Sequence, residues 1–301
     1  MVLAFELLRY IIDRLRKPEF SLVNTVDMSA HHASRQTVNL SRAKISIIIP
    51  TRDKSDLLRR CLATVNKTTE DLDIELVIVD NDSIEAKSQE LFEELKSRGA
   101  VVVKYPGSFN YSAICNLAAS KASGDYLCFL NNDTEVISPE WLLSMVEHAS
   151  QPSVGLVGAV LLYPDNTLQH MGIALGMAGG IAGHPHRKGS RNEFLPDKCF
   201  EVSGVTFACA VISKAKFEAL GGLDEKFPVG FNDVDISIKS RDSGFQNIIC
   251  TRSALTHAES QSRPTLKSLK GFISSVWEVV TFLRLHPNQH SDRFFHRRVS
   301  R

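Results

Sequence analysis

Between residues 44 and 131, short apolar runs rich in β-branched residues alternate with segments whose apolar residues have helical spacing. The runs predicted to be buried strands are 44–50, 74–80, 100–105 and 125–131, and the segments predicted to be helices are 53–67, 84–99 and 110–124, the last two ending at Gly99 and Gly124. Strict alternation of this kind is typical of a parallel sheet with helices on both faces. The sequence therefore predicts an α/β fold with a mostly parallel central sheet flanked by helices.

Charge and cysteine content limit the classes of partner. A net charge of +1 over 301 residues argues against a nucleic-acid partner held by bulk electrostatics. The cysteines show no CxxC spacing, and we interpret them as reduced core residues of a cytoplasmic protein, neither a disulfide framework nor a zinc site. They are Cys61, Cys115, Cys128, Cys199, Cys209 and Cys250.

The N-terminal segment 1–17 has apolar residues at helical spacing and several basic residues, which predicts an amphipathic helix. Such a helix could lie on the anionic inner face of the cell membrane, or it could pack on its own domain or on a partner. Charged residues inside the apolar pattern do not suit a cleavable signal peptide, and no run approaches the roughly 20 apolar residues of a membrane span. Residues 18–44 are polar and predict a linker.

Polar residues follow three of the predicted strands at the point where each strand ends. They are Pro50, Thr51 and Arg52, then Asp80, Asn81 and Asp82, then Asn131, Asn132 and Asp133. Each group alone could be a turn, because Asn and Asp favour turns. Ligands of parallel sheets bind outside the carboxyl ends of the strands, so three such groups together predict a binding site at one edge.

The second half of the chain has a less regular pattern. We expect helices at 138–149, with Ser138 as the N-cap, at 231–244, ending at Gly244, and at 266–285, strands at 154–164 and 245–260, and a strand followed by a helix within 200–222. The glycine-rich stretch 171–189 predicts a mobile loop that could close as a lid or contact the acceptor. His170, His184 and His186 could instead form a metal cluster there. Trp141 and Trp277 are expected in the core.

Several motifs in this order resemble family-2 glycosyltransferases, with closest similarity to bacterial O-antigen and surface-polysaccharide transferases. The motifs are IIIPTRDK, ELVIVDNDS, FNYSAICN, SGDYLCFLNNDTEV, LLYPDNTLQHMG, PVGFNDVDISIKSRDSGF and ALTHAESQSR. The resemblance implies a glycosyltransferase-A fold with a Rossmann-like sheet and helical extensions at both ends. It divides the chain into an N-terminal helix and linker (1–44), a catalytic domain (45–262, with a nucleotide-sugar half to 135 and an acceptor half from 136) and a C-terminal helical tail (263–301).

The resemblance also implies a donor site that holds a UDP- or dTDP-sugar with Mn²⁺ or Mg²⁺. In the family, Asp-x-Asp usually follows the fourth strand, so here Asp133 matches a metal ligand and Asn131 replaces the first Asp as a weak ligand. His257, after the last strand, matches a further metal ligand in several members. Thr51 and Arg52, with Pro50 beside them, match residues that border the base, Asp80 matches a residue that binds the base edge, and Asn81, Asp82 and Asn132 could share in donor binding.

Asp233 matches the second member of the family's acidic pair and is the implied general base, which takes the proton of an acceptor hydroxyl on a glycan or a lipid-linked glycan. Attack opposite the leaving group makes such an enzyme inverting. Helix capping is the alternative role of Asp233. Asn232, like Asn131, stands where the family has an acid, so a catalytically degenerate sugar-nucleotide-binding subunit remains an alternative function. A sugar-nucleotide pyrophosphorylase is disfavoured, because the first strand is followed by no glycine-rich phosphate loop.

Overall fold

The computed structural model of the protein describes residues 20–22, 43–177, 181–190, 198–258, 269–289 and 291–297. The predicted helix at 1–17 lies outside the described residues, as does most of the predicted linker. Within these ranges no helix is both long enough and apolar enough to cross a bilayer.

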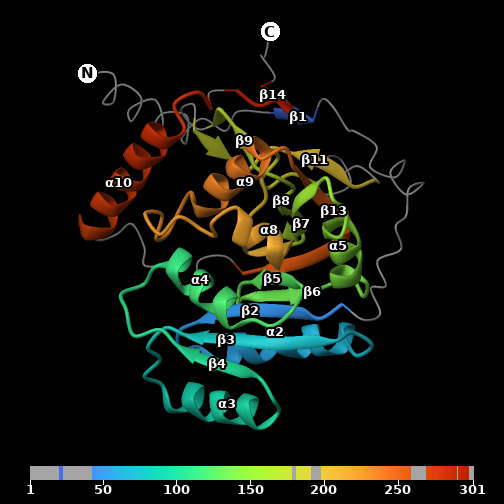
Figure 1. Ribbon diagram of the computed structural model, residues 1–301, viewed down its shortest axis with the longest axis vertical. Helices are drawn as coiled ribbons and strands as arrows, with labels where there is room; N and C mark the ends of the chain where they lie inside the picture. The colour runs from blue at the N-terminus through green and yellow to red at the C-terminus, as the bar shows by residue number, and fades with distance from the viewer. Residues whose placement is uncertain are drawn as a thin grey trace.

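A ten-stranded mixed sheet forms the centre of the molecule, and its main path has the order β11-β13-β7-β12-β5-β2-β3-β4 (Figure 1). β6 pairs with β13 and β8 pairs with β7 outside that path. The strands are β2 (Ile45–Thr51), β3 (Ile74–Asp80), β4 (Val101–Lys104), β5 (Tyr126–Leu130), β6 (Thr134–Val136), β7 (Val154–Leu162), β8 (Leu168–His170), β11 (Phe200–Val202), β12 (Cys209–Ser213) and β13 (Gln246–His257).

Helices cover both faces of this sheet, as the alternation predicts. One face carries α2 (Ser55–Thr68), α3 (Ala86–Ser97) and α5 (Trp141–Ala149), and the other carries α4 (Tyr111–Lys121), α8 (Lys214–Ala219) and α9 (Asn232–Asp242). A smaller apolar cluster joins α9 to the C-terminal helix α10 (Leu269–Leu285). The predicted α/β architecture is confirmed.

The direction of the strands decides where the polar residues meet. β2, β3, β4 and β5 are parallel neighbours, whereas β12 runs antiparallel between β5 and β7. β13 is parallel to β7, so it ends at the same edge as β2, β3 and β5. β6 pairs antiparallel with the end of β13, in a register that places His257 opposite Thr134. The strand ends of both halves therefore share one edge of the sheet.

Two short antiparallel pairs lie outside the main sheet. β1 (Phe20–Leu22) pairs with β14 (Phe295–Arg297), so the predicted linker contains a strand that joins the two ends of the chain. β9 (Ala174–Leu175) pairs with β10 (Ala182–Gly183) inside the glycine-rich stretch.

Three local predictions were wrong. α4 ends at Lys121, and Gly124 instead allows a close approach, because a Cβ there would lie 2.7 Å from the backbone nitrogen of Ser46. Ser138 is not the N-cap of α5, since its hydroxyl accepts a hydrogen bond from Ala254 N at 3.1 Å. Trp141 is buried as expected, but Trp277 on α10 is 62% exposed.

Candidate active site

A cavity of about 460 Å³ opens at the shared edge, between the nucleotide-sugar half and the acceptor half predicted from the sequence. The residues predicted to form the site line it, except Asp80 and Asp82. Those lining it are Pro50, Thr51, Arg52, Asn81, Asn131, Asn132, Asp133, Asp233 and His257. The fold thus brings together side chains that lie up to 207 residues apart in sequence, from Pro50 to His257.

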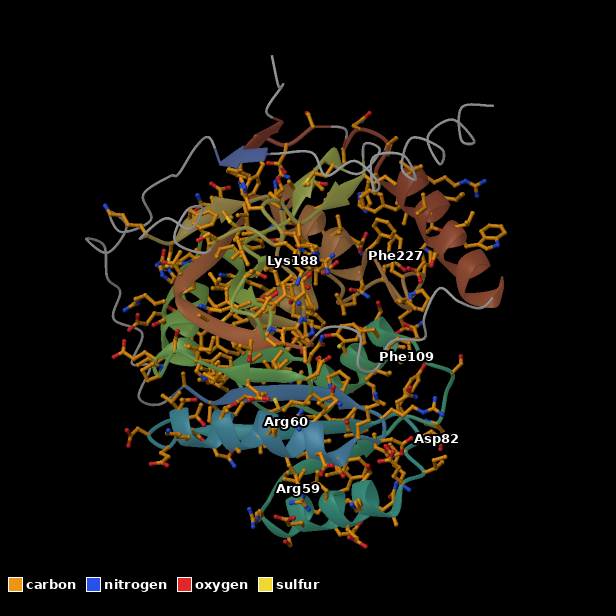
Figure 2. All side chains as sticks on the ribbon, turned by 180° about the vertical axis from the view of Figure 1, so that it is seen from behind. Arg59, Arg60, Asp82, Phe109, Lys188 and Phe227 are labelled. Carbon is orange, nitrogen blue, oxygen red and sulfur yellow. The ribbon has the colours of Figure 1, made fainter. Side chains whose placement is uncertain are left out.

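Asp80 and Asp82 serve the turn after β3. The carboxylate of Asp80 is buried and accepts a hydrogen bond from Ser83 N at 2.8 Å. Asp82 is exposed, has a φ of 61°, and lies at the rim of the first half (Figure 2). Neither side chain is part of the cavity lining, so Asn81 is the member of this triplet that lines the cavity.

Asp133, His257 and Asn131 form the polar centre of the cavity. His257 Nε2 lies 3.1 Å from Asp133 Oδ1 and 3.3 Å from Asn131 Nδ2. The side chains of Asp133 and His257 are almost wholly buried, with 5% and 6% exposed. A carboxylate and an imidazole nitrogen facing the same point are a donor set suited to a divalent cation such as Mn²⁺.

Gln169 on β8 orients His257, a role that was not predicted from the sequence. Gln169 Nε2 donates to the backbone oxygen of His257 at 3.2 Å, which leaves Gln169 Oε1 to accept from His257 Nδ1 at 2.6 Å. These contacts assign the proton to Nδ1 and the lone pair to Nε2, which faces Asp133. Ligand histidines in proteins commonly have such a partner on the second nitrogen. The residues present therefore fit a cation.

The first half of the cavity is held by links between neighbouring strand ends. Asn132 Nδ2 donates to Thr51 Oγ1 at 2.9 Å, which connects β5 to β2. Asn81 Nδ2 donates to the backbone oxygens of Tyr105 and Gly107 at 3.3 and 3.1 Å. The buried Asn81 Oδ1 accepts no hydrogen bond within the described part of the chain. An acceptor without a partner at a cavity wall suits a ligand N–H group.

Further lining residues were not predicted from the sequence. Asp53 has a φ of 51° and its carboxylate accepts from Ile84 N and Glu85 N at 2.7 and 2.9 Å, which joins the loops after β2 and β3. Tyr111 donates to Phe207 O at 2.9 Å and places an aromatic ring at the cavity. The remaining lining residues, which the sequence did not assign to the site, are Lys54, Glu85, Phe109, Ile114, Thr206, Phe207, Ala208, Val229 and Asn232. The DK pair after the first strand was the one signal that could have indicated Asp53.

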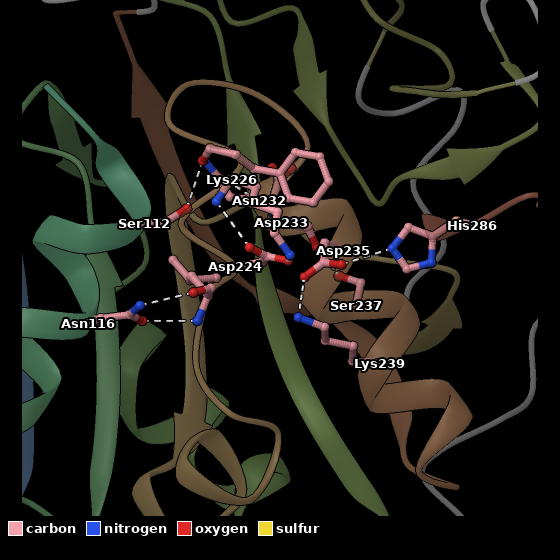
Figure 3. Close-up of polar contacts among 12 residues, drawn as sticks. Ser112, Asn116, Asp224, Lys226, Asn232, Asp233, Asp235, Ser237, Lys239 and His286 are labelled. Atoms are coloured by element: carbon pink, nitrogen blue, oxygen red, sulfur yellow. Dashed lines mark hydrogen bonds and ion pairs between the residues drawn. The ribbon is translucent and has the colours of Figure 1, made fainter. Parts of the chain in front are cut away.

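Asp233 enters the cavity from the first turn of α9, opposite the nucleotide-sugar half. Phe231 precedes the helix with a φ of 62°, and Asn232 Oδ1 accepts from Asp233 N at 2.8 Å. Asp233 Oδ1 accepts from Val234 N at 2.9 Å, so the capping role and a place in the cavity coexist. Asp235, two positions further along the helix, is fully buried and is not part of the cavity lining. Figure 3 shows it between Lys239 and His286.

α10 holds the segment that carries Asp233. The carboxylate of Glu278 accepts from Val229 N and Gly230 N at 3.1 and 2.7 Å. Burial raises the pKa of Glu278 from 4.5 to about 7, against the lowering effect of these two hydrogen bonds. The rings of Phe231 and Phe282 stack at 5.0 Å between centroids.

A buried charge cluster adds a second link between α9 and α10. Asp235 Oδ1 lies 2.8 Å from His286 Nε2, and Asp235 Oδ2 lies 2.6 Å from Lys239 Nζ (Figure 3). The segment before α9 also contacts the first half, because Ser112 Oγ donates to Phe227 O at 2.7 Å.

The glycine-rich stretch contributes a histidine pair beside the site. His170 Nδ1 lies 2.9 Å from His184 Nδ1, and complete burial, together with the neighbouring His184, holds the pKa of His170 well below 6.5. Within the described residues, His186 does not join these two in a metal-binding group. The three-histidine alternative is therefore not supported there.

Comparisons with known proteins agree with this architecture. Residues 46–221 match the family described as glycosyl transferase family 2. The chain is 40% identical over 226 residues to the uncharacterized protein y4gI of Sinorhizobium fredii (strain NBRC 101917 / NGR234), covering 73% of this chain and 25% of that protein. It is 37% identical over 234 residues to the O-antigen biosynthesis protein RfbC of Myxococcus xanthus, covering 73% of this chain and 18% of that protein. The chain thus spans a quarter or less of the length of these relatives.

Among solved structures, the chain is similar to GalNAc-T7, determined with UDP, GalNAc and Mn²⁺. The TM-score is 0.60 at 18% identity, over 79% of this chain and 48% of that chain. At this identity the likeness shows the fold, which is the glycosyltransferase-A arrangement of a central sheet between helices.

Proposed function

The chain belongs to glycosyl transferase family 2, and from that premise we propose that it transfers a sugar from a nucleoside-diphosphate sugar to a hydroxyl group, with inversion at the anomeric carbon. One observation carries the proposal: Asp133 and His257 face each other in the same cavity that Asp233 lines from the acceptor half. A site for the leaving group and a carboxylate base in one cavity are what a single displacement requires.

The donor would bind against the ends of β2, β3 and β5. The Asn81 carbonyl can accept from an N–H of a pyrimidine base, which supports a UDP- or dTDP-sugar. Arg52 lies in the same wall and brings a positive charge for the diphosphate. Pro50, Thr51 and Asn132 shape the floor between them. Asp80 and Asp82 act indirectly in this scheme, through the turn that presents Asn81.

Asp133 and His257 would hold Mn²⁺ or Mg²⁺, with Asn131 as a weaker ligand. When bound, the cation neutralises the negative charge that develops on the departing diphosphate. Gln169 keeps the lone pair of His257 Nε2 directed at the site, and Asn132 fixes the β5 loop to Thr51. The protein's own contribution is therefore to hold the cation-ligating atoms in place before the cation and the sugar nucleotide bind.

Asp233 would accept the proton of the acceptor hydroxyl as that oxygen attacks the anomeric carbon. The side chain belongs to the first turn of α9, where the helix dipole favours its ionised form. Phe109, Tyr111 and Phe207 provide apolar and aromatic surface in the same cavity, which helps to exclude water from the reacting groups.

We further propose that residues 45–262 form the catalytic domain, between an N-terminal helix with linker (1–44) and a C-terminal tail (263–301). The similarity to an O-antigen biosynthesis protein supports a glycan or lipid-linked glycan as acceptor, in bacterial surface-polysaccharide synthesis. We place the enzyme in the cytoplasm, at the inner face of the cell membrane if residues 1–17 bind there.

The experiment is a donor screen on the full chain, with UDP-, dTDP- and GDP-linked sugars in the presence and absence of Mn²⁺. We expect one donor to raise the melting temperature and to be hydrolysed slowly when no acceptor is present. Turnover that requires Mn²⁺ and is lost in both Asp133→Asn and Asp233→Asn supports the proposal. Equal turnover in the parent chain and in Asp233→Asn would contradict the assignment of the base.

A catalytically degenerate donor-binding subunit is the second candidate function. It is favoured by Asn131, whose amide lies 3.3 Å from His257 Nε2 and so competes with a cation for that lone pair. Donor binding without hydrolysis of any donor, with or without Mn²⁺, is the result that selects this alternative.

A further inference from the structure

Three metal-binding side chains meet in a second place, away from the cavity. They are His148 on α5, Cys199 immediately before β11, and Cys250 on β13. One imidazole nitrogen and the two sulfur atoms all lie within 4.8 Å of one another. Figure 1 shows α5, β11 and β13 together at one side of the molecule.

The sheet register explains how these residues come together. β11 and β13 are antiparallel, with Phe200 opposite Ile249, so the next position along each strand sets Cys199 opposite Cys250. α5 packs on the same face of the sheet, and both cysteines belong to the apolar cluster beneath it. All three side chains are at least nine-tenths shielded from solvent. His148, Cys199 and Cys250 are about fifty positions apart in sequence. The lack of CxxC spacing, on which we excluded a zinc site from the sequence, therefore does not bear on this group, and the proposal below revises that interpretation for Cys199 and Cys250.

Polar groups accompany the two thiols. Cys199 Sγ lies 3.9 Å from Thr251 Oγ1, and the next residue along β13, Arg252, has its guanidinium 2.8 Å from Glu147. A metal cation displaces the protons of the thiols that bind it, so two cysteines and a histidine placed this close together can act as ligands.

We propose that His148, Cys199 and Cys250 bind one Zn²⁺ ion at a site distinct from the catalytic cavity. Two thiolates and one imidazole match the ligands of tetrahedral zinc, with a fourth position left for water. Such sulfur-rich sites disfavour Mn²⁺ and Mg²⁺, which prefer oxygen ligands. Cys250 lies seven residues before His257 on β13, but β13 is irregular between Cys250 and Ala254, and the same span covers about four positions of the paired strand β7, roughly 13 Å at the rise of a strand. The two metal sites can therefore be tested separately.

The zinc ion would join α5, the start of β11 and the middle of β13. β11 is the last strand of the main path, hydrogen-bonded on one side to β13. A bound ion adds a link between this strand and a helix on the sheet face, so its expected effect is on stability rather than on turnover.

The first test uses Co²⁺ as a spectroscopic probe on the full-length chain after treatment with a chelator. We expect a thiolate-to-cobalt charge-transfer band that saturates at one ion per chain and disappears when Zn²⁺ is added. Cys199→Ser and Cys250→Ser should abolish the band. Cys115→Ser, a buried cysteine outside the group, should retain it, and so should Asp133→Asn, which removes a ligand of the proposed catalytic cation.

The second test needs no variant and so does not depend on whether the substitutions fold. The unmodified chain is alkylated under mild denaturation with and without Zn²⁺, and each cysteine is followed by mass spectrometry. Selective protection of Cys199 and Cys250 by Zn²⁺ supports the site. Absence of a charge-transfer band, survival of the band in Cys199→Ser, equal alkylation in both conditions, or a Cys199–Cys250 disulfide that forms despite added Zn²⁺ would each overturn the proposal.

Discussion

Asp233 and Asp235 lie two positions apart on α9, and their replacement by asparagine is expected to have opposite consequences. Asp233 lines the cavity, whereas Asp235 is fully buried between α9 and α10. Asp233→Asn should therefore change turnover without changing stability, and Asp235→Asn should mainly lower stability. Each variant serves as the matched control for the other, because the chemical change is identical.

The stability effect follows from the contacts of Asp235. Its Oδ1 lies 2.8 Å from His286 Nε2, and its Oδ2 lies 2.6 Å from Lys239 Nζ. The Lys239 contact is an ion pair without hydrogen-bond geometry, because Oδ2 accepts no hydrogen bond among the described residues. Breaking a buried charge pair costs about 3–5 kcal/mol. The Lys239 side chain is 36% exposed and regains water, so we expect a loss of about 2–4 kcal/mol in unfolding free energy.

The turnover effect follows from the proposed role of Asp233. Asparagine can still accept the hydrogen bond from Val234 N, so the start of the helix is preserved. It cannot take a proton, and loss of a general base lowers kcat by about 10²–10⁴-fold. Donor affinity should stay within about twofold of the parent chain, because this residue faces the acceptor side.

The assays are thermal unfolding, calorimetric donor binding and the rate of donor hydrolysis, in which water replaces the acceptor. Asp235→Asn should lower the Tm by roughly 5–10 °C, and Asp233→Asn should leave it unchanged. The reasoning is refuted if Asp233→Asn hydrolyses donor at the parent rate, or if Asp235→Asn unfolds at the parent temperature.

Three further outcomes are expected. The native pKa of Glu278, about 7, lies above its ordinary value of 4.5, so its contribution to stability is full below pH 4.5 and is lost as the pH rises through 7. The Tm of Glu278→Gln should therefore fall less than the Tm of the parent between pH 5 and 8. Parallel curves of Tm against pH for the two proteins would contradict this. Gln169→Leu removes the partner of His257 Nδ1 and should weaken Mn²⁺ binding about 10–100-fold by calorimetry, whereas unchanged affinity would show that His257 needs no such support. Gly124→Ala places a methyl group 2.7 Å from Ser46 N and should lower the unfolding free energy by about 1–3 kcal/mol in urea titrations; an unchanged midpoint would mean that the backbone moves there at no cost.

The first half of the molecule could be predicted in detail because its information is local. Each strand is a short β-branched run, each helix has its own apolar face, and parallel strands end at one edge by necessity. The strand order alone therefore predicts that Thr51, Asn81 and Asp133 belong to one site. The sequence does not distinguish the separate roles of Asp80, Asn81 and Asp82, because turns and ligand-binding sites use the same residue types.

The rest of the site depends on pairing between distant strands. Gln169 meets His257 only because β8 and β13 both flank β7, and Cys199 meets Cys250 only through the register of β11 on β13. Register of this kind is set by the whole packed sheet, and no short stretch of sequence specifies it. The exposed position of Trp277 has the same origin, since the way α10 lies on α9 decides which of its sides faces solvent.

The segment 227–231 is secured from outside the sheet, by the hydroxyl of Ser112 on one side and by Glu278 and Phe282 on the other. In the proposed function, donor binding and proton removal by Asp233 therefore depend on different parts of the chain. A protein shortened before α10 should still bind a sugar nucleotide. Asp233, however, would lose the contacts from α10 that hold its segment in position.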